Sequence, residues 1–155
     1  MVTIDTLKDK IDNNSRLLGL DMGSKRIGVS ICDDKRKIAT PYKTIQFTNI
    51  ENLSSELSDI IKENNISGII VGNPLNMDGS FGKSSQSIRD KAKIIGEKID
   101  IPVCLWDERL STSGAYSLSS DIDIKISQKK KKIDEKAATF ILQGAIDYLN
   151  NLTLA

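Results

Sequence analysis

The chain has 155 residues and a formal net charge of only +1, because 22 Lys and Arg residues nearly balance 21 Asp and Glu residues. It has 0 histidines, which excludes Ser/His/Asp and Cys/His nucleophilic catalysis as well as histidine-based zinc sites. The length, the 39% hydrophobic content and the lack of a Pro/Gly/Ser-rich linker indicate a single globular domain that buries its own core.

The first part of the chain is predicted to form an antiparallel meander. Residues 1–15 are an N-terminal extension that holds either a weak helix or a loose segment. Hydrophobic patterning then predicts three strands joined by short turns, at 17–20, 27–32 and about 37–47. Gly23 and Gly28 would allow a tight connection between the first two strands. Pro41 places the third strand at an edge of the sheet, because proline donates no backbone hydrogen bond.

The rest of the chain alternates helices and strands. We predict a helix at 50–61 ended by Asn64 and Asn65, a buried strand at 67–71, a loop at 72–80, a helix at 84–98 and a strand at 102–106. A helix after Thr112, a polar loop near 119–131 and a last helix opening at Asp134 complete a domain at 16–150, before a tail at 151–155. The predicted fold is α/β, with a mixed five-stranded sheet (an antiparallel meander, then parallel strands) and helices on both faces.

Three acidic residues stand where these elements begin or end. Asp21 follows the first strand, although a strand-end Asp is also common as a plain turn residue. Glu108 follows the apolar strand at 102–106, and open α/β sheets place their active sites at the carboxyl ends of their strands. The alternative interpretation is that Glu108 lies in a solvated loop and forms a weak local ion pair. Asp134 lies on the same face of the last helix as the apolar residues that pack inward. The alternative interpretation is that it only complements the positive end of the helix dipole. Isolated carboxylates are costly to desolvate, so three that converge indicate a divalent cation and phosphoryl chemistry.

Basic and polar residues next to these acids are candidates for substrate contacts. Lys25 and Arg26 follow the first acid and Arg109 follows the second, so all three are candidates for phosphate contacts. A lysine run at 129–132, which includes Lys130, precedes the third acid, although such runs are usually solvated loops. The loop at 72–80, which contains Asn73, could bind substrate through its backbone amides or be a simple surface loop.

Four motifs in order carry a resemblance to a known family. The segments LLGLDMGSKRIGVS, VGNPLNMDGS, DERLSTSGA and DEKAATFILQGAIDYL resemble the YqgF family of Holliday-junction-resolvase-like nucleases, also described as pre-16S rRNA nucleases. The resemblance runs from about Leu17 to Leu149. The chain departs from the family in its longer N-terminal extension and at Lys83 after the glycine loop, and neither difference touches the acids.

The resemblance implies an RNase H-like fold and a metal-dependent nuclease with Asp21, Glu108 and Asp134 as catalytic acids and metal ligands. One or two Mg²⁺ or Mn²⁺ ions are the expected cofactors, since carboxylate oxygens suit hard cations. The expected substrate is the 5′ end of pre-16S rRNA during ribosome biogenesis. The alternatives are a Holliday-junction-resolvase-like DNA endonuclease and a nucleic-acid-binding protein without catalysis.

Further properties are expectations of the same kind. The segment DMGSKRIG also resembles the first phosphate loop of actin-like and sugar-kinase-like ATPases, which usually need two such domains around the nucleotide. The partner is expected to be structured RNA or branched DNA, bound by a monomer or a homodimer. Cys32 and Cys104 stand singly, as small buried residues do in a reducing compartment. With no apolar run of membrane length and no signal-peptide pattern, we expect a cytoplasmic protein without membrane contact.

Overall fold

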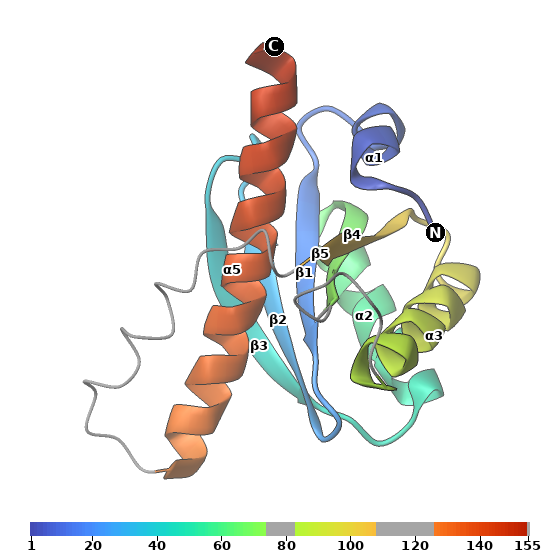
Figure 1. Ribbon diagram of the computed structural model, residues 1–155, viewed down its shortest axis with the longest axis vertical. Helices are drawn as coiled ribbons and strands as arrows, with labels where there is room; N and C mark the ends of the chain where they lie inside the picture. The colour runs from blue at the N-terminus through green and yellow to red at the C-terminus, as the bar shows by residue number, and fades with distance from the viewer. Residues whose placement is uncertain (74–82, 108–125, 155) are drawn as a thin grey trace.

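The fold is a five-stranded mixed sheet, seen in a computed structural model that describes residues 1–73, 83–107 and 126–154 (Figure 1). The strand order is β3-β2-β1-β4-β5. The pairs β1/β2 and β2/β3 are antiparallel, whereas β1/β4 and β4/β5 are parallel. The strands span β1 Arg16–Met22, β2 Arg26–Cys32, β3 Ala39–Gln46, β4 Ile66–Asn73 and β5 Val103–Asp107. The predicted meander followed by parallel strands is therefore confirmed, with the first strand at the centre.

The edge position predicted for the third strand is also confirmed. β3 lies at one end of the strand order and pairs with β2 alone. Pro41 sits within β3, where the register shifts beside Val29 and Ser30 of β2. Proline is tolerated there because an edge strand has one side that needs no donor.

Helices cover both faces of the sheet, so the core has two layers (Figure 1). On one face, α2 (Ile50–Asn64) and α3 (Lys83–Lys98) pack against strand residues that include Leu18, Leu20 and Val71. On the other face, α5 (Ile126–Leu154) and α1 (Ile4–Lys10) pack against Leu17, Ile70 and other residues. Successive strand residues point to opposite faces, which explains why the buried strands read as continuous apolar runs. No helix among residues 1–73, 83–107 and 126–154 is long and apolar enough to cross a membrane.

The last helix begins earlier than predicted. α5 starts at Ile126, so the expected loop near 119–131 is wrong for its final residues, and the helix also continues through Leu154 into the expected tail. Lysine is a good helix former, and the lysine run at 129–132 extends the helix rather than breaking it. Asp134 consequently lies more than two turns inside α5. The helix-dipole explanation for this residue therefore fails, because that effect fades within the first turn.

The N-terminal extension is helical and packs on the domain. α1 has a capping box between Thr3 and Thr6, and its Leu7 is fully buried. The Tyr148 hydroxyl of α5 donates a 2.9 Å hydrogen bond to the Asp5 carboxylate. Ahead of the helix, Val2 forms a parallel bridge with Cys104 of β5, which partly covers that edge of the sheet. Residues 1–15 thus contribute to the core on the α5 face.

Two buried serines give opposite expectations for the same substitution. The Ser30 hydroxyl on β2 donates a 2.7 Å hydrogen bond to the Ala138 carbonyl of α5. Ser54 on α2 is also buried, but its hydroxyl has no partner among the described residues. Ser30→Ala should therefore lower the free energy of unfolding by about 1 kcal/mol, whereas Ser54→Ala should leave it unchanged or raise it by up to about 0.5 kcal/mol. Urea unfolding of both variants checks the pair, and equal losses would contradict it.

Candidate functional site

The first candidate acid lies near the carboxyl end of the central strand. Leu18, Leu20 and Met22 of β1 all belong to the core under α2 and α3. Asp21 lies between the last two of these and therefore faces α5. Its cross-strand partner on β2 is Gly28.

The pair formed by Asp21 and Gly28 determines how closely α5 approaches the sheet. A methyl group added at Gly28 would overlap the backbone oxygen of Asp134. The missing side chain therefore lets α5 rest on the backbone of β2 directly beside Asp21. Gly28 lies within β2, as the strand predicted at 27–32 implies, and not in the turn after β1. Gly23 does lie in that turn, where its amide donates to the carbonyls of Asp21 and Arg26 at 3.2 and 3.0 Å.

A second contact one helical turn later holds α5 in this position. Ser30 follows Gly28 by two residues and so points to the same face of β2, where its hydroxyl bonds the Ala138 carbonyl. Opposite Ser30, a methyl group at Gly19 of β1 would come within 2.7 Å of the Leu142 Cβ atom. Small residues on β1 and β2 thus form the surface on which α5 packs. Asp134 lies at the end of this surface that is close to Asp21.

Asp134 is paired with a cation from the sheet. The Arg26 Nε atom lies 2.8 Å from the Asp134 Oδ2 atom, in a charge-assisted hydrogen bond that joins the start of β2 to α5. The two side chains keep 31% and 22% of their surfaces exposed. Arg26 and Asp134, both predicted as site residues, are therefore in direct contact, and Arg26 offsets the charge of this acid.

Among the described residues, no cation pairs with Asp21 in the same way. Burial and, to a lesser extent, the negative charge of Asp134 raise the pKa of Asp21 from 3.8 to about 6. Within the described part of the chain, no group donates a hydrogen bond to this carboxylate. A divalent cation would counter the repulsion from Asp134, and carboxylate oxygens are the ligands that Mg²⁺ and Mn²⁺ prefer. The chemistry of this pair therefore fits a hard divalent cation.

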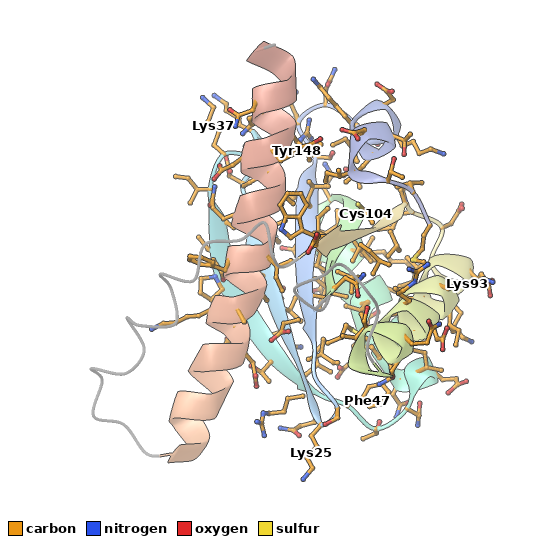
Figure 2. The ribbon with its side chains drawn as sticks, viewed as in Figure 1. Lys25, Lys37, Phe47, Lys93, Cys104 and Tyr148 are labelled. Carbon is orange, nitrogen blue, oxygen red and sulfur yellow. The ribbon has the colours of Figure 1, made fainter. Side chains whose placement is uncertain are left out.

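The remaining predicted site residues are distributed as follows. Glu108, Arg109 and Lys130 fall outside the residues whose side chains the structure describes. No group of three or more His, Cys, Asp or Glu residues that could hold a metal ion occurs in the described ranges. Of the three predicted acids, the structure therefore describes only the pair Asp21 and Asp134. Lys25 is exposed in the turn between β1 and β2, next to Arg26 (Figure 2).

Asn73 lies on the other face of the sheet from the acid pair. It ends β4 in register with Asp107 of β5, and it alternates with Val71 and Ile69, which face α3. Its Oδ1 atom accepts a 2.5 Å hydrogen bond from the hydroxyl of Ser85 in the first turn of α3, and both side chains are buried. The structure thus separates Asn73 from Asp21 by the thickness of the sheet. Sequence reasoning did not identify Ser85, since nothing in its local pattern distinguishes it from its neighbours.

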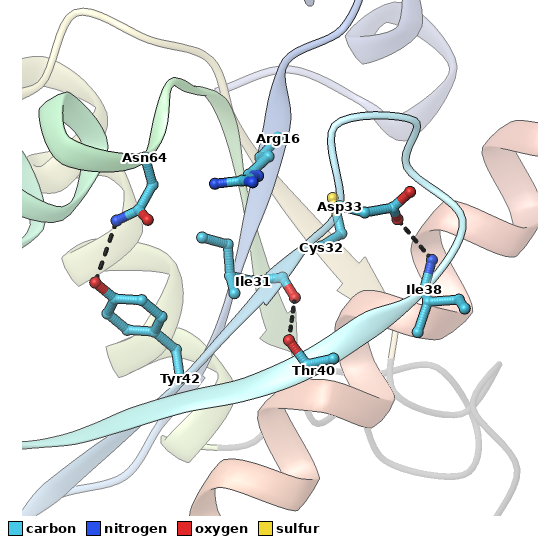
Figure 3. A pocket seen from close by; sticks show the side chains of 8 residues that line it. All are labelled: Arg16, Ile31, Cys32, Asp33, Ile38, Thr40, Tyr42 and Asn64. Atoms are coloured by element: carbon cyan, nitrogen blue, oxygen red, sulfur yellow. Dashed lines mark hydrogen bonds between the residues drawn. The ribbon is translucent and has the colours of Figure 1, made fainter.

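A surface hollow lies away from the acids, at the opposite end of β1 (Figure 3). It has a volume of about 450 Å³ and extends between β2, β3 and the end of α2. Arg16, at the start of β1, and Tyr42, whose hydroxyl accepts a 3.2 Å hydrogen bond from Asn64, are among its lining residues. Because Asp21 is near the other end of the same strand, this hollow is separate from the acid pair.

Comparisons with known proteins identify the family. The family model RuvX, described as "Holliday junction resolvase", matches residues 15–148. The chain belongs to this family. The resemblance read from the four sequence motifs is thereby confirmed. A protein of Pelagibacter ubique (strain HTCC1062) named "Putative pre-16S rRNA nuclease" is 62% identical over 151 residues, which cover 97% of this chain and 100% of that protein. A protein of the same name from Rhizobium meliloti (strain 1021) is 38% identical and covers 98% of this chain and 92% of its own length.

Solved structures show the same fold at low sequence identity. RuvC of T. thermophilus, in complex with a Holliday junction substrate, has a TM-score of 0.55 and 8% identity, covering 88% of this chain and 96% of its own. The yeast mitochondrial Holliday junction resolvase Ydc2 has a TM-score of 0.53 and 18% identity, covering 97% of this chain and 86% of its own. The RNase H-like fold of this resolvase group, predicted from the motifs, is therefore confirmed.

Proposed function

We propose that this protein is a divalent-metal-dependent nuclease that hydrolyses phosphodiester bonds, with a ribosomal RNA precursor as its substrate. The observation that carries the proposal is the half-buried Asp21 carboxylate beside Asp134, in a pair to which the described residues supply a single cation, Arg26. The names of the full-length relatives support precursor 16S rRNA as the substrate, and its processing as the role.

Three acids are assigned to the reaction. Asp21 and Asp134 would hold the metal ion together with Glu108, which is assigned by its place in the family motif and by its position directly after β5. One or two bound Mg²⁺ or Mn²⁺ ions would supply a water of lowered pKa and would neutralise charge at the phosphate. This chemistry suits a chain that has no histidine to serve as a general base.

Basic residues around the acids are assigned to substrate binding. Hydrolysis joins a water oxygen to phosphorus and breaks one P–O bond, so negative charge must be held on the phosphate oxygens. Arg26 is bonded to Asp134 and Lys25 precedes it in the turn, whereas Arg109 and Lys130 are assigned by their proximity in sequence to Glu108 and Asp134. Asn73 would contribute through its backbone, because its side chain is buried and bonded to Ser85. With aromatic residues at only 5%, contacts to phosphates and to nucleic-acid shape are favoured over base stacking.

Cleavage of branched DNA is the second candidate function. The description of the matching family favours it, and the motifs that resemble this family span nearly the whole chain. A four-way junction has two-fold symmetry, so this function would favour a homodimer over a monomer. Both candidate functions use the same hydrolytic chemistry at the acid pair. The nucleic acid that the protein cleaves therefore distinguishes them more directly than the acid pair does.

A cleavage panel tests the proposal. Structured RNAs carrying the 5′ precursor end of 16S rRNA, four-way DNA junctions and unstructured controls are incubated with the protein in Mg²⁺, in Mn²⁺ and in EDTA. We expect cleavage of the precursor RNA only with a metal ion, and an approximately 1000-fold or larger loss in Asp134→Asn. Asp147→Asn is the matched control, since Asp147 is an exposed acid of the same helix.

The outcomes of the panel are separable. Cleavage of junctions but not of RNA would replace the first candidate with the second. If neither substrate is cut with either metal, the hydrolytic function is wrong. Calorimetric titration with ATP then tests the ATPase alternative, and retained RNA affinity without cleavage would indicate a binding protein.

A further inference from the structure

Arg26 holds Asp134 by one nitrogen only. Its Nε atom donates to Asp134 Oδ2, and the structure gives its remaining guanidinium nitrogens no partner among the described residues. The backbone of Arg26 is fixed separately, because the residue pairs with Gln46 of β3. The side chain, which is 31% exposed, can therefore leave Asp134 without any change in the sheet.

The position of this guanidinium conflicts with a bound divalent cation. A cation shared by Asp21 and Asp134 would sit within a few ångströms of the Arg26 nitrogen bonded to the same carboxylate, and a doubly charged ion repels a neighbouring guanidinium strongly in a partly buried site. Solvent next to the exposed side chain offers Arg26 a second position.

We propose, on the basis of the nuclease function above, that Arg26 is a placeholder cation. It occupies Asp134 in the metal-free protein and is released when a divalent ion binds to the acids. The released guanidinium is then free to bind a phosphate of the nucleic acid, whose oxygens match its planar fork. Metal binding and substrate binding are thereby coupled through one side chain, and the coupling is reciprocal.

Metal affinity is the first test, because it requires no catalysis. Mn²⁺ binding is measured from the EPR signal of the free ion for wild type, Arg26→Gln and Lys25→Gln. Removing the competitor should tighten Mn²⁺ binding by about five- to tenfold in Arg26→Gln. Lys25→Gln removes the same charge from the adjacent exposed position and should change the affinity by less than about twofold. Arg26→Gln should nevertheless cleave more slowly, since the phosphate contact is lost.

The side chain itself is the second test. The Nε–H signal of Arg26 in a ¹⁵N NMR spectrum, assigned by its loss in Arg26→Gln, should be protected from exchange without metal and lose that protection as Mg²⁺ is added. Arg36 is the internal reference, because its Nη1 atom donates to the carbonyls of Asp12 and Ser15 at 2.8 and 2.9 Å, away from the acids.

Each result distinguishes this inference from the proposed function. If wild type binds Mn²⁺, but Arg26→Gln binds it no more tightly and the Arg26 signal is unchanged by Mg²⁺, the placeholder role is wrong while the nuclease proposal stands. If neither wild type nor Arg26→Gln binds Mn²⁺, the metal site itself is wrong and both proposals fall. Binding by Arg26→Gln alone would support the placeholder role in its strongest form.

Discussion

Asp21→Asn is expected to yield a protein that is more stable than wild type at neutral pH and no longer cuts nucleic acid. The cleavage rate should fall on the order of 1000-fold or more, because the amide lacks the negative charge that a metal ligand needs. At the same time the amide removes a half-buried charge that is repelled by Asp134. The free energy of unfolding in EDTA at pH 7.5 should therefore rise by roughly 2 to 3 kcal/mol.

The pH dependence gives this expectation a sign that can be checked. The pKa of Asp21 is about 6 in the native protein, against 3.8 for an exposed aspartate carboxyl. Well below pH 3.8 both states are protonated and Asp21 contributes nothing to the free energy of unfolding. Between these values the native state keeps a proton that the unfolded state releases, so stability falls as the pH rises towards 6. Above pH 6 the ionised Asp21 lowers the free energy of unfolding by its full amount. Asp21→Asn should remove the fall in stability between about pH 4 and pH 6.

Urea unfolding of wild type and Asp21→Asn at several pH values, with and without Mg²⁺, makes the measurement. At a Mg²⁺ concentration 100-fold above the dissociation constant, wild type should gain about 2.7 kcal/mol, and the variant much less. Asp147→Asn serves as the control and should follow wild type in every condition. A variant that is less stable than wild type at pH 7.5 in EDTA would contradict the assigned environment of Asp21.

Gly28→Ala is expected to separate the acids by pushing α5 off the sheet. The added methyl group would overlap the Asp134 backbone oxygen, and neither the strand nor the helix can yield cheaply at that point. The free energy of unfolding should fall by about 3 kcal/mol, at the upper end of overpacking effects. Cleavage should fall by about 100-fold even in the molecules that remain folded, because a displacement of about 1 Å is enough to cost that much.

Gly96→Ala is the matched control for this substitution. Gly96 lies in α3, and a methyl group there would meet the Val103 Cγ2 atom at 3.6 Å, an ordinary contact. Alanine is a better helix former than glycine, so this variant should gain about 0.5 to 1 kcal/mol and retain full cleavage. Thermal and urea unfolding with cleavage of the same RNA measure both variants. Normal cleavage by folded Gly28→Ala would show that the close approach at Gly28 does not position the acids.

Local pattern was sufficient to predict most of the sheet and the position of its first acid. Alternating and continuous apolar runs predicted all five strands, and Pro41 predicted the edge, because each signal depends on a strand's own residues and on which faces are buried. Asp21 could be placed near a strand end for the same reason. The start of α5 was missed, because the polar, lysine-rich segment at 126–133 has no apolar stripe to reveal a helix.

The sequence by itself determined the order of the elements, the acids available and the family. Only the tertiary structure decided which of these residues meet. Arg26 and Asp134 are far apart in the chain, and their hydrogen bond depends on how closely α5 packs over Gly28. Asn73 was predicted to contact substrate from a loop, yet it ends β4 and strand alternation turns its side chain to the α3 face. Contacts of this kind depend on packing between distant elements, which no local period encodes.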